Sequence, residues 1–156
     1  MLPQTHSFEE LWLDRKMDID RLHAVIEGRY KWVRGAGNTF GVFIRMIHEV
    51  LQGDHGNHYL YIGQTDIATE LYAIRPMYNV LTQEGFTVKP RRQRQQLHIE
   101  NTDMTFTFAH PYRGFERRFY GYMFSRIFVD LTPDTEWDYE RELFEINLRN
   151  QEYRYG

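Results

Sequence analysis

Apolar residues recur along this chain in two alternating patterns, one with helical spacing and one with the spacing of a strand. Helical spacing covers residues 7–27, 40–51, 65–81 and 133–149. Short runs rich in β-branched and aromatic residues lie at 29–33, 58–62, 86–89, 96–100, 104–108 and 127–130. The pattern therefore predicts strands that alternate with helices, interrupted in the middle by consecutive strands.

Local signals set the expected ends of these elements. Gly28 is expected to end the first helix, and Thr65 or Asp66 to cap the third. Pro76 lies inside the third helix and should kink it or split it, because proline lacks an N–H and clashes with the preceding turn. Residues 101–103 read Asn-Thr-Asp and predict a hairpin turn between two strands.

The chain length and composition fit one folded domain over residues 1–156. We expect an N-terminal helix at 7–27, a core at 28–135 and a C-terminal helix at 133–149. The absence of cysteine excludes disulfides, cysteine zinc sites and thiol nucleophiles. No apolar run approaches the roughly 20 residues that span a bilayer, and no signal-peptide pattern is present, so we expect no membrane partner and a cytoplasmic location.

The segment from Tyr30 to Phe40 has the order strand, glycine loop, helix. Such loops hold a phosphate on backbone N–H groups and on a helix N-terminus. Where a lysine normally reaches the phosphates, this chain has Asn38. The residues expected to contact a nucleotide are Lys31, Arg34, Gly35, Ala36, Gly37, Asn38 and Thr39. The alternative is that the glycines only allow a tight turn between strand and helix.

A second motif, Arg126-Ile-Phe-Val-Asp130, is an apolar strand that ends in a carboxylate. A carboxylate at this place in a nucleotide-hydrolysing domain holds Mg²⁺. If ATP and Mg²⁺ bind, we expect Asp130 and Thr39 to be the metal-binding residues and Asp130 to be the catalytic one. The alternative is an ordinary buried strand with a terminal aspartate.

The order of these motifs resembles the ATPase domain of phage large terminases, the motors that package DNA. The loop of that family often reads Arg-Gly-Ser/Ala-Gly-Lys-Ser/Thr, and residues 34–39 here read Arg-Gly-Ala-Gly-Asn-Thr. Tyr59 to Gly63, the β section around residues 101–106, the Arg113-Gly114 loop and Asp130 follow in the family's order. The resemblance covers about residues 28–135. It implies an α/β fold of the P-loop NTPase class, a three-layer sheet flanked by helices with an inserted antiparallel β section.

Departures from the family favour binding over turnover. Asn38 has no charge, and Leu131 occupies the position where the family usually places a glutamate that orients water. Loss of one such electrostatic group typically lowers a rate by roughly 10²–10³. The resemblance thus implies a trimmed, catalytically degraded phage protein in the host cytoplasm that binds a nucleotide weakly, or a protein or nucleic-acid partner, or a second copy of itself. The alternatives are an active DNA-packaging ATPase that uses Lys31 or Arg34, and an interaction module such as an inhibitor of a host enzyme.

A basic, aromatic middle section suggests one further interface, although the net charge of the chain is −3. Basic residues interleaved with aromatic residues suit a groove that follows a nucleic-acid backbone. The residues expected to contact it are Arg91, Arg92, Arg94, Arg117 and Arg118. The alternative is a solvated, charged hairpin. A metal site at Asp54, His55 and His58 is disfavoured, because the spacing matches no established ligand pattern.

Overall fold

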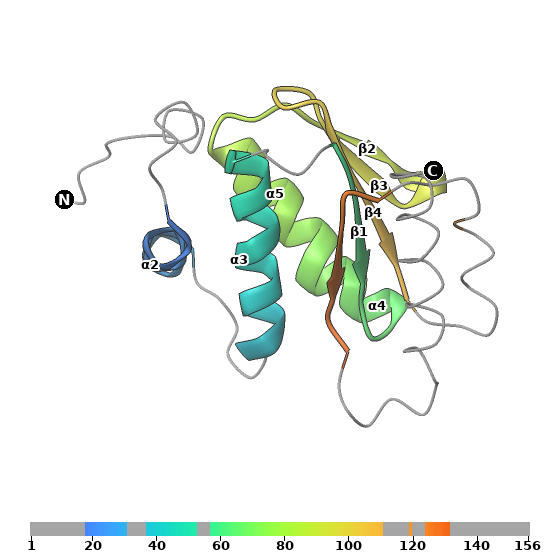
Figure 1. The fold of residues 1–156 in the computed structure, drawn as a ribbon, viewed down its shortest axis with the longest axis horizontal. Coiled ribbons are helices and arrows are strands. Elements are labelled where there is room, and N and C mark those ends of the chain that lie inside the picture. The colour runs from blue at the N-terminus through green and yellow to red at the C-terminus, as the bar shows by residue number, and fades with distance from the viewer. Residues whose placement is uncertain (1–17, 31–36, 53–56, 111–118, 120–123, 132–156) are drawn as a thin grey trace.

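The structure is a computed structural model that describes residues 18–30, 37–52, 57–110, 119 and 124–131 (Figure 1). Its helices α2 and α3 span Ile19–Arg29 and Gly37–Gln52. A third helical segment consists of α4 (Asp66–Thr69), the π-helical turn η1 (Glu70–Ile74) and α5 (Arg75–Gln83). The strands are β1 (His58–Ile62), β2 (Val88–Arg91), β3 (Gln96–Ile99), β4 (Met104–Ala109) and β5 (Arg126–Val129), and a short 3-10 helix, η2 (Arg92–Arg94), links β2 to β3.

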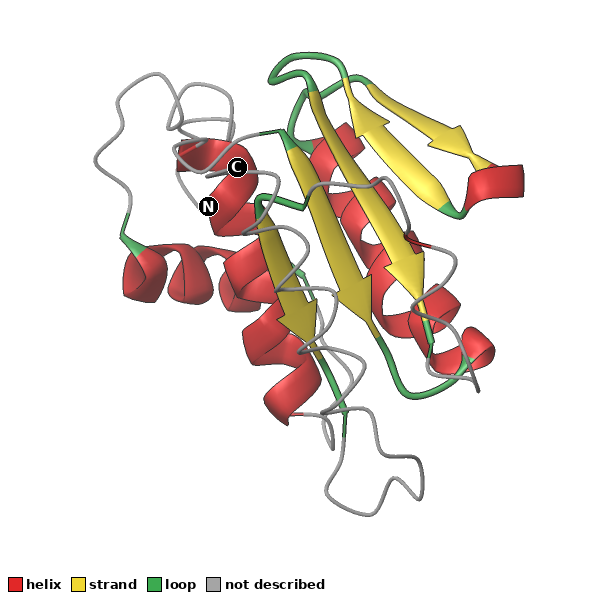
Figure 2. Ribbon diagram, turned by 45° about the vertical axis from the view of Figure 1, so that its right-hand side comes forward, coloured by secondary structure: helices red, strands yellow, loops and turns green. Residues whose placement is uncertain are grey.

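The described strands form one mixed sheet in the order β2-β3-β4-β1-β5. Strand β1 is parallel to both β4 and β5, with Leu60 opposite Thr107 and Ile127. Strands β2, β3 and β4 are antiparallel neighbours. The predicted α/β class and the antiparallel section are therefore confirmed, and β4 joins the two parts of the sheet (Figure 2).

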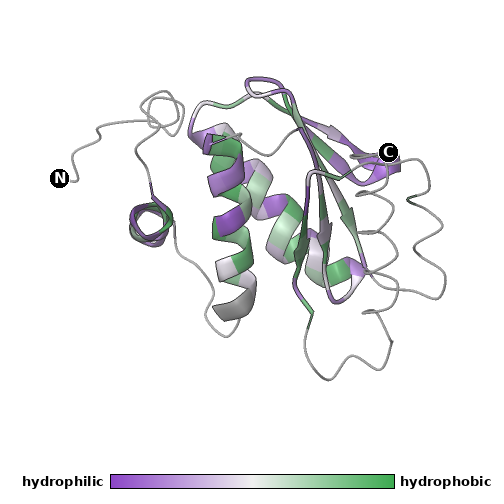
Figure 3. Cartoon of the chain, in the orientation of Figure 1, coloured by the Kyte–Doolittle hydropathy of each residue, from purple (hydrophilic) through white to green (hydrophobic). Residues whose placement is uncertain are grey.

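The two faces of the sheet are buried against different parts of the chain. Tyr59 stacks on Phe106 with ring centroids 4.8 Å apart, and both belong to the core beneath α3 and α5. Leu60 and Ile62 point to the other face, where Phe124 covers them. Strand β5 is hydrophobic along most of its length, whereas the β2–β3 hairpin carries hydrophilic residues (Figure 3). Each fully buried large apolar side chain contributes about 1.5–3 kcal/mol to folding.

Helix α3 and strand β1 occupy the positions that the sequence predicts. The apolar face of α3 buries Phe43, Met46, Ile47 and Val50 in the core. Helices α2 to α5 lie on the same side of the sheet, with α2 outside α3 (Figure 1). The predicted helix at 133–149 lies outside the described residues, so the third layer of the predicted fold stays a prediction.

Helix α2 differs from the prediction at both of its ends. It begins after Asp18, whose carboxylate accepts a hydrogen bond from the backbone N–H of Arg21 at 2.7 Å. It continues through Gly28 to Arg29, and the N–H of Tyr30 still donates to the Ile26 carbonyl. The predicted helix end at Gly28 and the strand start at Arg29 are therefore wrong. Residues 7–17 and 31–33 of the two predicted elements lie outside the described part of the chain.

The third helix is interrupted as Pro76 predicts. Thr65 is the cap, and its hydroxyl accepts from the N–H of Ala68 at 3.0 Å. The π-helical turn at Glu70–Ile74 precedes Pro76, which lies in the first turn of α5. Because proline has no N–H and would crowd the carbonyl four residues earlier, a wider turn before it is the expected accommodation.

Strand boundaries shift by small amounts. Phe86 and Thr87 connect α5 to β2, because the Phe86 N–H closes the helix end by donating to the Leu81 carbonyl at 2.9 Å. Strand β2 therefore begins at Val88, two residues later than predicted. The predicted turn at 101–103 is confirmed between β3 and β4. Within the part of the chain that the structure describes, no helix is long and apolar enough to cross a membrane.

Candidate functional site at the carboxyl edge of the parallel strands

Three parallel strands end at one edge of the sheet, and α3 begins at the same end of the molecule (Figures 1 and 2). Gly63 follows β1, His110 follows β4 and Asp130 follows β5. Open α/β sheets bind ligands outside the carboxyl ends of their strands, where loops and helix N-termini meet. This edge is therefore the candidate site.

Asp130 is held by its neighbour on β1. The Tyr61 hydroxyl donates to Asp130 Oδ2 at 2.7 Å, and the Asp130 N–H donates to the Ile62 carbonyl at 2.8 Å. Burial raises the pKa of Tyr61, and its hydrogen bond to Asp130 raises the pKa further. Tyr61 therefore remains a neutral donor, and any metal ion at this carboxylate would share it with the phenol.

Because Gly63 has no side chain, the side chains of Thr69 and Tyr61 can approach its backbone closely. A Cβ at position 63 would lie 2.3 Å from Thr69 Oγ1 and 2.9 Å from Tyr61 Cε1, so no larger residue fits without movement. The Thr69 hydroxyl oxygen is buried and has no hydrogen-bond partner among the residues that the structure describes. Sequence reasoning identified Gly63 only as the end of a strand, because the approach of Thr69 depends on how α4 folds back.

A close polar contact joins the neighbouring loop ends. His110 Nδ1 lies 2.7 Å from Asp66 Oδ1, so the end of β4 is tied to the first turn of α4. The sequence indicated a possible cap at Asp66, but it did not predict the contact with His110, which follows from β4 lying next to β1.

The predicted nucleotide loop lies partly outside the described residues. Lys31, Arg34, Gly35 and Ala36 fall there, whereas Gly37, Asn38 and Thr39 form the first turn of α3. Thr39 is half-buried. The first turn of α3 carries no acidic residue, so no side-chain charge within that turn opposes the partial positive charge of the helix N-terminus.

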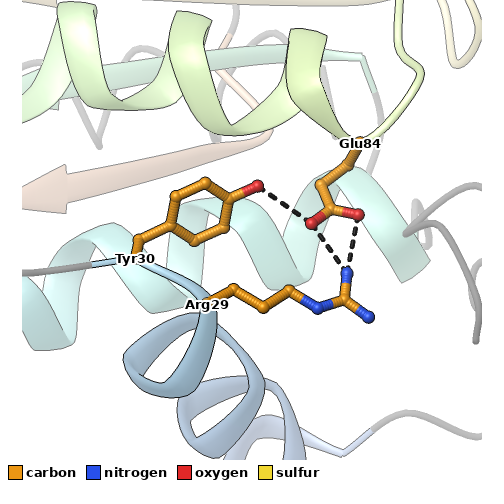
Figure 4. A network of polar contacts seen from close by, with 3 residues as sticks. All are labelled: Arg29, Tyr30 and Glu84. Carbon is orange, nitrogen blue, oxygen red and sulfur yellow. Dashed lines mark hydrogen bonds and ion pairs between the residues drawn. The ribbon is translucent and has the colours of Figure 1, made fainter. Parts of the chain in front are cut away.

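A buried carboxylate anchors the chain just before that loop (Figure 4). Arg29 Nη1 donates to both Glu84 oxygens at 2.7 Å, and the Tyr30 hydroxyl donates to Glu84 Oε1 at 2.9 Å. Burial raises the pKa of Tyr30, and Glu84 raises it further. The network joins the end of α2 to the end of α5. Sequence reasoning missed it, since no local pattern links residues 55 positions apart.

The predicted nucleic-acid residues lie elsewhere on the sheet. Arg91 ends β2, Arg92 and Arg94 form η2, and all three are exposed at the edge farthest from β5. Arg117 and Arg118 lie outside the described residues. Lys89 pairs with Glu100 at 2.7 Å, and both are exposed, so the pair contributes little. Nucleic-acid binding stays a prediction.

Of the disfavoured metal site at Asp54, His55 and His58, only His58 lies among the described residues. It begins β1, with Nε2 3.4 Å from Thr107 Oγ1. Burial lowers the pKa of His58, which favours its neutral form. Within the described ranges, no group of three His, Asp or Glu residues could hold a metal ion.

Four large apolar side chains on the third helical segment are exposed. Ile67 is 73 % exposed, Leu71 43 %, and Tyr72 and Tyr78 38 % each. Exposed apolar groups are what a protein partner covers. The predicted protein partner stays a prediction.

Comparisons of the chain with protein-family models, with curated proteins and with solved structures gave no match. The resemblance to terminases therefore stays a prediction, and the functional argument depends on the geometry at the carboxyl edge.

Proposed function

We propose that this protein binds a nucleotide at the carboxyl edge of its parallel strands and does not turn it over efficiently. The phosphates would lie at the N-terminus of α3, on backbone N–H groups of residues 34–39. Asp130 would face them from the end of β5, through Mg²⁺ where the metal is present. In this proposal the chain works by binding, as a degraded relative of phosphate-loop ATPases.

One observation carries the proposal: α3 begins at the end of the sheet where β5 ends in Asp130 (Figures 1 and 2). A phosphate loop needs a helix N-terminus and a metal-binding carboxylate on the same side of the sheet. Had α3 run in the opposite direction, its N-terminus and Asp130 would lie at opposite ends of the sheet.

Two features support binding without turnover. The Tyr61 hydroxyl occupies one oxygen of Asp130, and the next residue, Leu131, has no group that positions water. Asn38 stands in the first turn of α3 in place of a lysine. Backbone N–H groups and the helix dipole still favour an anion there, but the charge that stabilises the transition state is missing.

Restoring the missing charge tests the proposed site. Asn38→Lys should tighten the binding of ATP with Mg²⁺ by roughly tenfold, as expected for a charge-assisted phosphate contact. The matched control is Asn57→Lys, which makes the same charge change at an exposed residue just before β1, at the opposite end of that strand. Affinities would be measured by calorimetric titration.

Equal effects of the two substitutions would mean that the added charge acts through the net charge of the protein and not at α3. An unchanged affinity in Asn38→Lys, with a folded protein, would place the nucleotide elsewhere. Either result contradicts the proposed site.

A further inference from the structure

A cavity of about 680 Å³ lies between the third helical segment and the hairpin side of the sheet. Ile74 and Tyr78 line it from the helices, and Leu97 and Phe108 line it from the sheet. Small-molecule sites typically measure about 300–1,000 Å³ and combine apolar walls with a few polar groups. The cavity therefore has the size of a ligand site, and polar and charged residues outnumber apolar ones in its lining.

In the part of the chain that the structure describes, some of the charged side chains around this cavity have a partner of opposite charge or a polar partner, and one does not. Asp66 pairs with His110, and Glu70 lies 3.3 Å from Arg75. Arg92 also lines the cavity, is exposed, and forms no ion pair within the described residues. The two acidic residues are thus already partnered, while one guanidinium is available to an anion.

The backbone around the cavity is unusual in two places. The π-helical turn η1 contributes Glu70 and Ile74 to one wall. Gln95, on the opposite side, has a φ of 51°, in the left-handed region that a residue with a side chain rarely adopts. Such conformations persist where the surrounding structure holds them, and they concentrate at ligand sites.

A buried polar atom adds to this pattern. Thr69 lines the cavity and is only 4 % exposed, and within the described part of the chain its hydroxyl oxygen has no hydrogen-bond partner. That oxygen lies 2.3 Å from where a Cβ on Gly63 would stand, so the cavity wall is packed against the end of β1 at this point.

We propose that this cavity binds a flat, ring-containing small molecule that carries one acidic group. The ring lies against Tyr78, which is 38 % exposed, because aromatic rings favour stacked or edge-on contacts. The acidic group pairs with the guanidinium of Arg92, which can donate two parallel hydrogen bonds. Asn79 and Gln95, also in the lining, supply amide groups to the edge of the ring. This cavity shares Asp66 and Thr69 with the carboxyl edge of the parallel strands, but its proposed ligand does not depend on nucleotide binding at α3.

A matched pair of probes tests the charge requirement. We would titrate the isotope-labelled full chain with 2-naphthoate and with 2-naphthamide, which differ only in the acidic group, and follow the backbone amide signals. We expect saturable shifts in residues 69–79 and 95–97, with 2-naphthoate bound roughly tenfold more tightly. If AMP displaces 2-naphthoate, the ligand of this cavity is a nucleotide. If AMP does not displace it, the ligand is an aromatic carboxylate.

Two arginines provide the matched variants. Arg92→Gln should weaken 2-naphthoate binding roughly tenfold, whereas Arg91→Gln, an exposed neighbour outside the cavity lining, should leave it unchanged. Both substitutions are at exposed positions, so the urea midpoint should not move. Equal binding of the two probes, equal effects of the two variants, or shifts confined to residues outside the lining would overturn the proposal.

Discussion

Tyr61 and Asp130 are diagonal neighbours on two parallel strands, and a hydrogen bond of 2.7 Å joins the tyrosine hydroxyl to the carboxylate. Tyr61 lies opposite Phe128 in the register of β1 and β5, so Asp130, two residues further on, comes within reach of its side chain. The bond fixes the end of β5 at the candidate site.

Removing that hydroxyl should destabilise the fold. Tyr61→Phe deletes a buried donor to a charged acceptor, and we expect a loss of about 1–2 kcal/mol in the free energy of unfolding. Urea unfolding at pH 7 measures it. Tyr72→Phe, at an exposed position, is the control and should change the value by less than about 0.5 kcal/mol. A Tyr61→Phe protein as stable as the wild type would show that the bond contributes nothing.

The Arg29–Glu84 pair gives a larger predicted effect, because Glu84 is 7 % exposed. Arg29→Met leaves a buried carboxylate without its cation and should cost about 2–3 kcal/mol. The exposed pair Lys89–Glu100 supplies the control, since Lys89→Met should cost under about 1 kcal/mol.

The double variant Arg29→Met/Glu84→Gln separates charge from shape. It removes the uncompensated charge, so part of the lost stability should return. If the double variant is less stable than Arg29→Met alone, the penalty does not come from an unpaired carboxylate.

His58 should make stability depend on pH on the acidic side of neutrality. Burial lowers its pKa below the unfolded value of about 6.5, so the unfolded chain takes up a proton first. Neutral His58 contributes its full stability above the unfolded pKa of about 6.5. This contribution is lost as the pH falls from the unfolded pKa toward the lower pKa of the folded state. Since the side chain is only partly buried, we expect less than about 1 kcal/mol between pH 7.5 and 5.5.

Urea unfolding at the two pH values tests this point. His58→Gln should reduce the difference between them, and His23→Gln, at an exposed position of α2, should not. Identical pH dependence in the wild type and His58→Gln would contradict the assignment.

Local patterns predicted the elements whose ends are set locally. The stripe that includes Phe43 and Ile47 predicted α3, the run at 58–62 predicted β1, and Pro76 predicted the interruption of the third helix. The end of α2 could not be predicted in this way. Arg29 stays helical beside Glu84, which is 55 residues away in sequence.

In the candidate site, too, local sequence patterns predicted some residues and missed those placed by long-range packing. A strand that ends in Asp130 is visible in the sequence, and parallel pairing places its end beside that of β1. Tyr61 and Thr69 escaped prediction, because one depends on strand register and the other on the close approach to Gly63. Both are long-range packing relationships that short-range periodicity does not encode.

The most direct test is calorimetric titration of the wild-type chain with ATP and Mg²⁺, with phosphate release measured on the same sample. The account predicts saturable heat of binding and no Mg²⁺-dependent release of phosphate above the background of the buffer. Sustained release that disappears in Asp130→Ala would contradict it by showing a working ATPase, and the absence of any binding heat would contradict the nucleotide site itself.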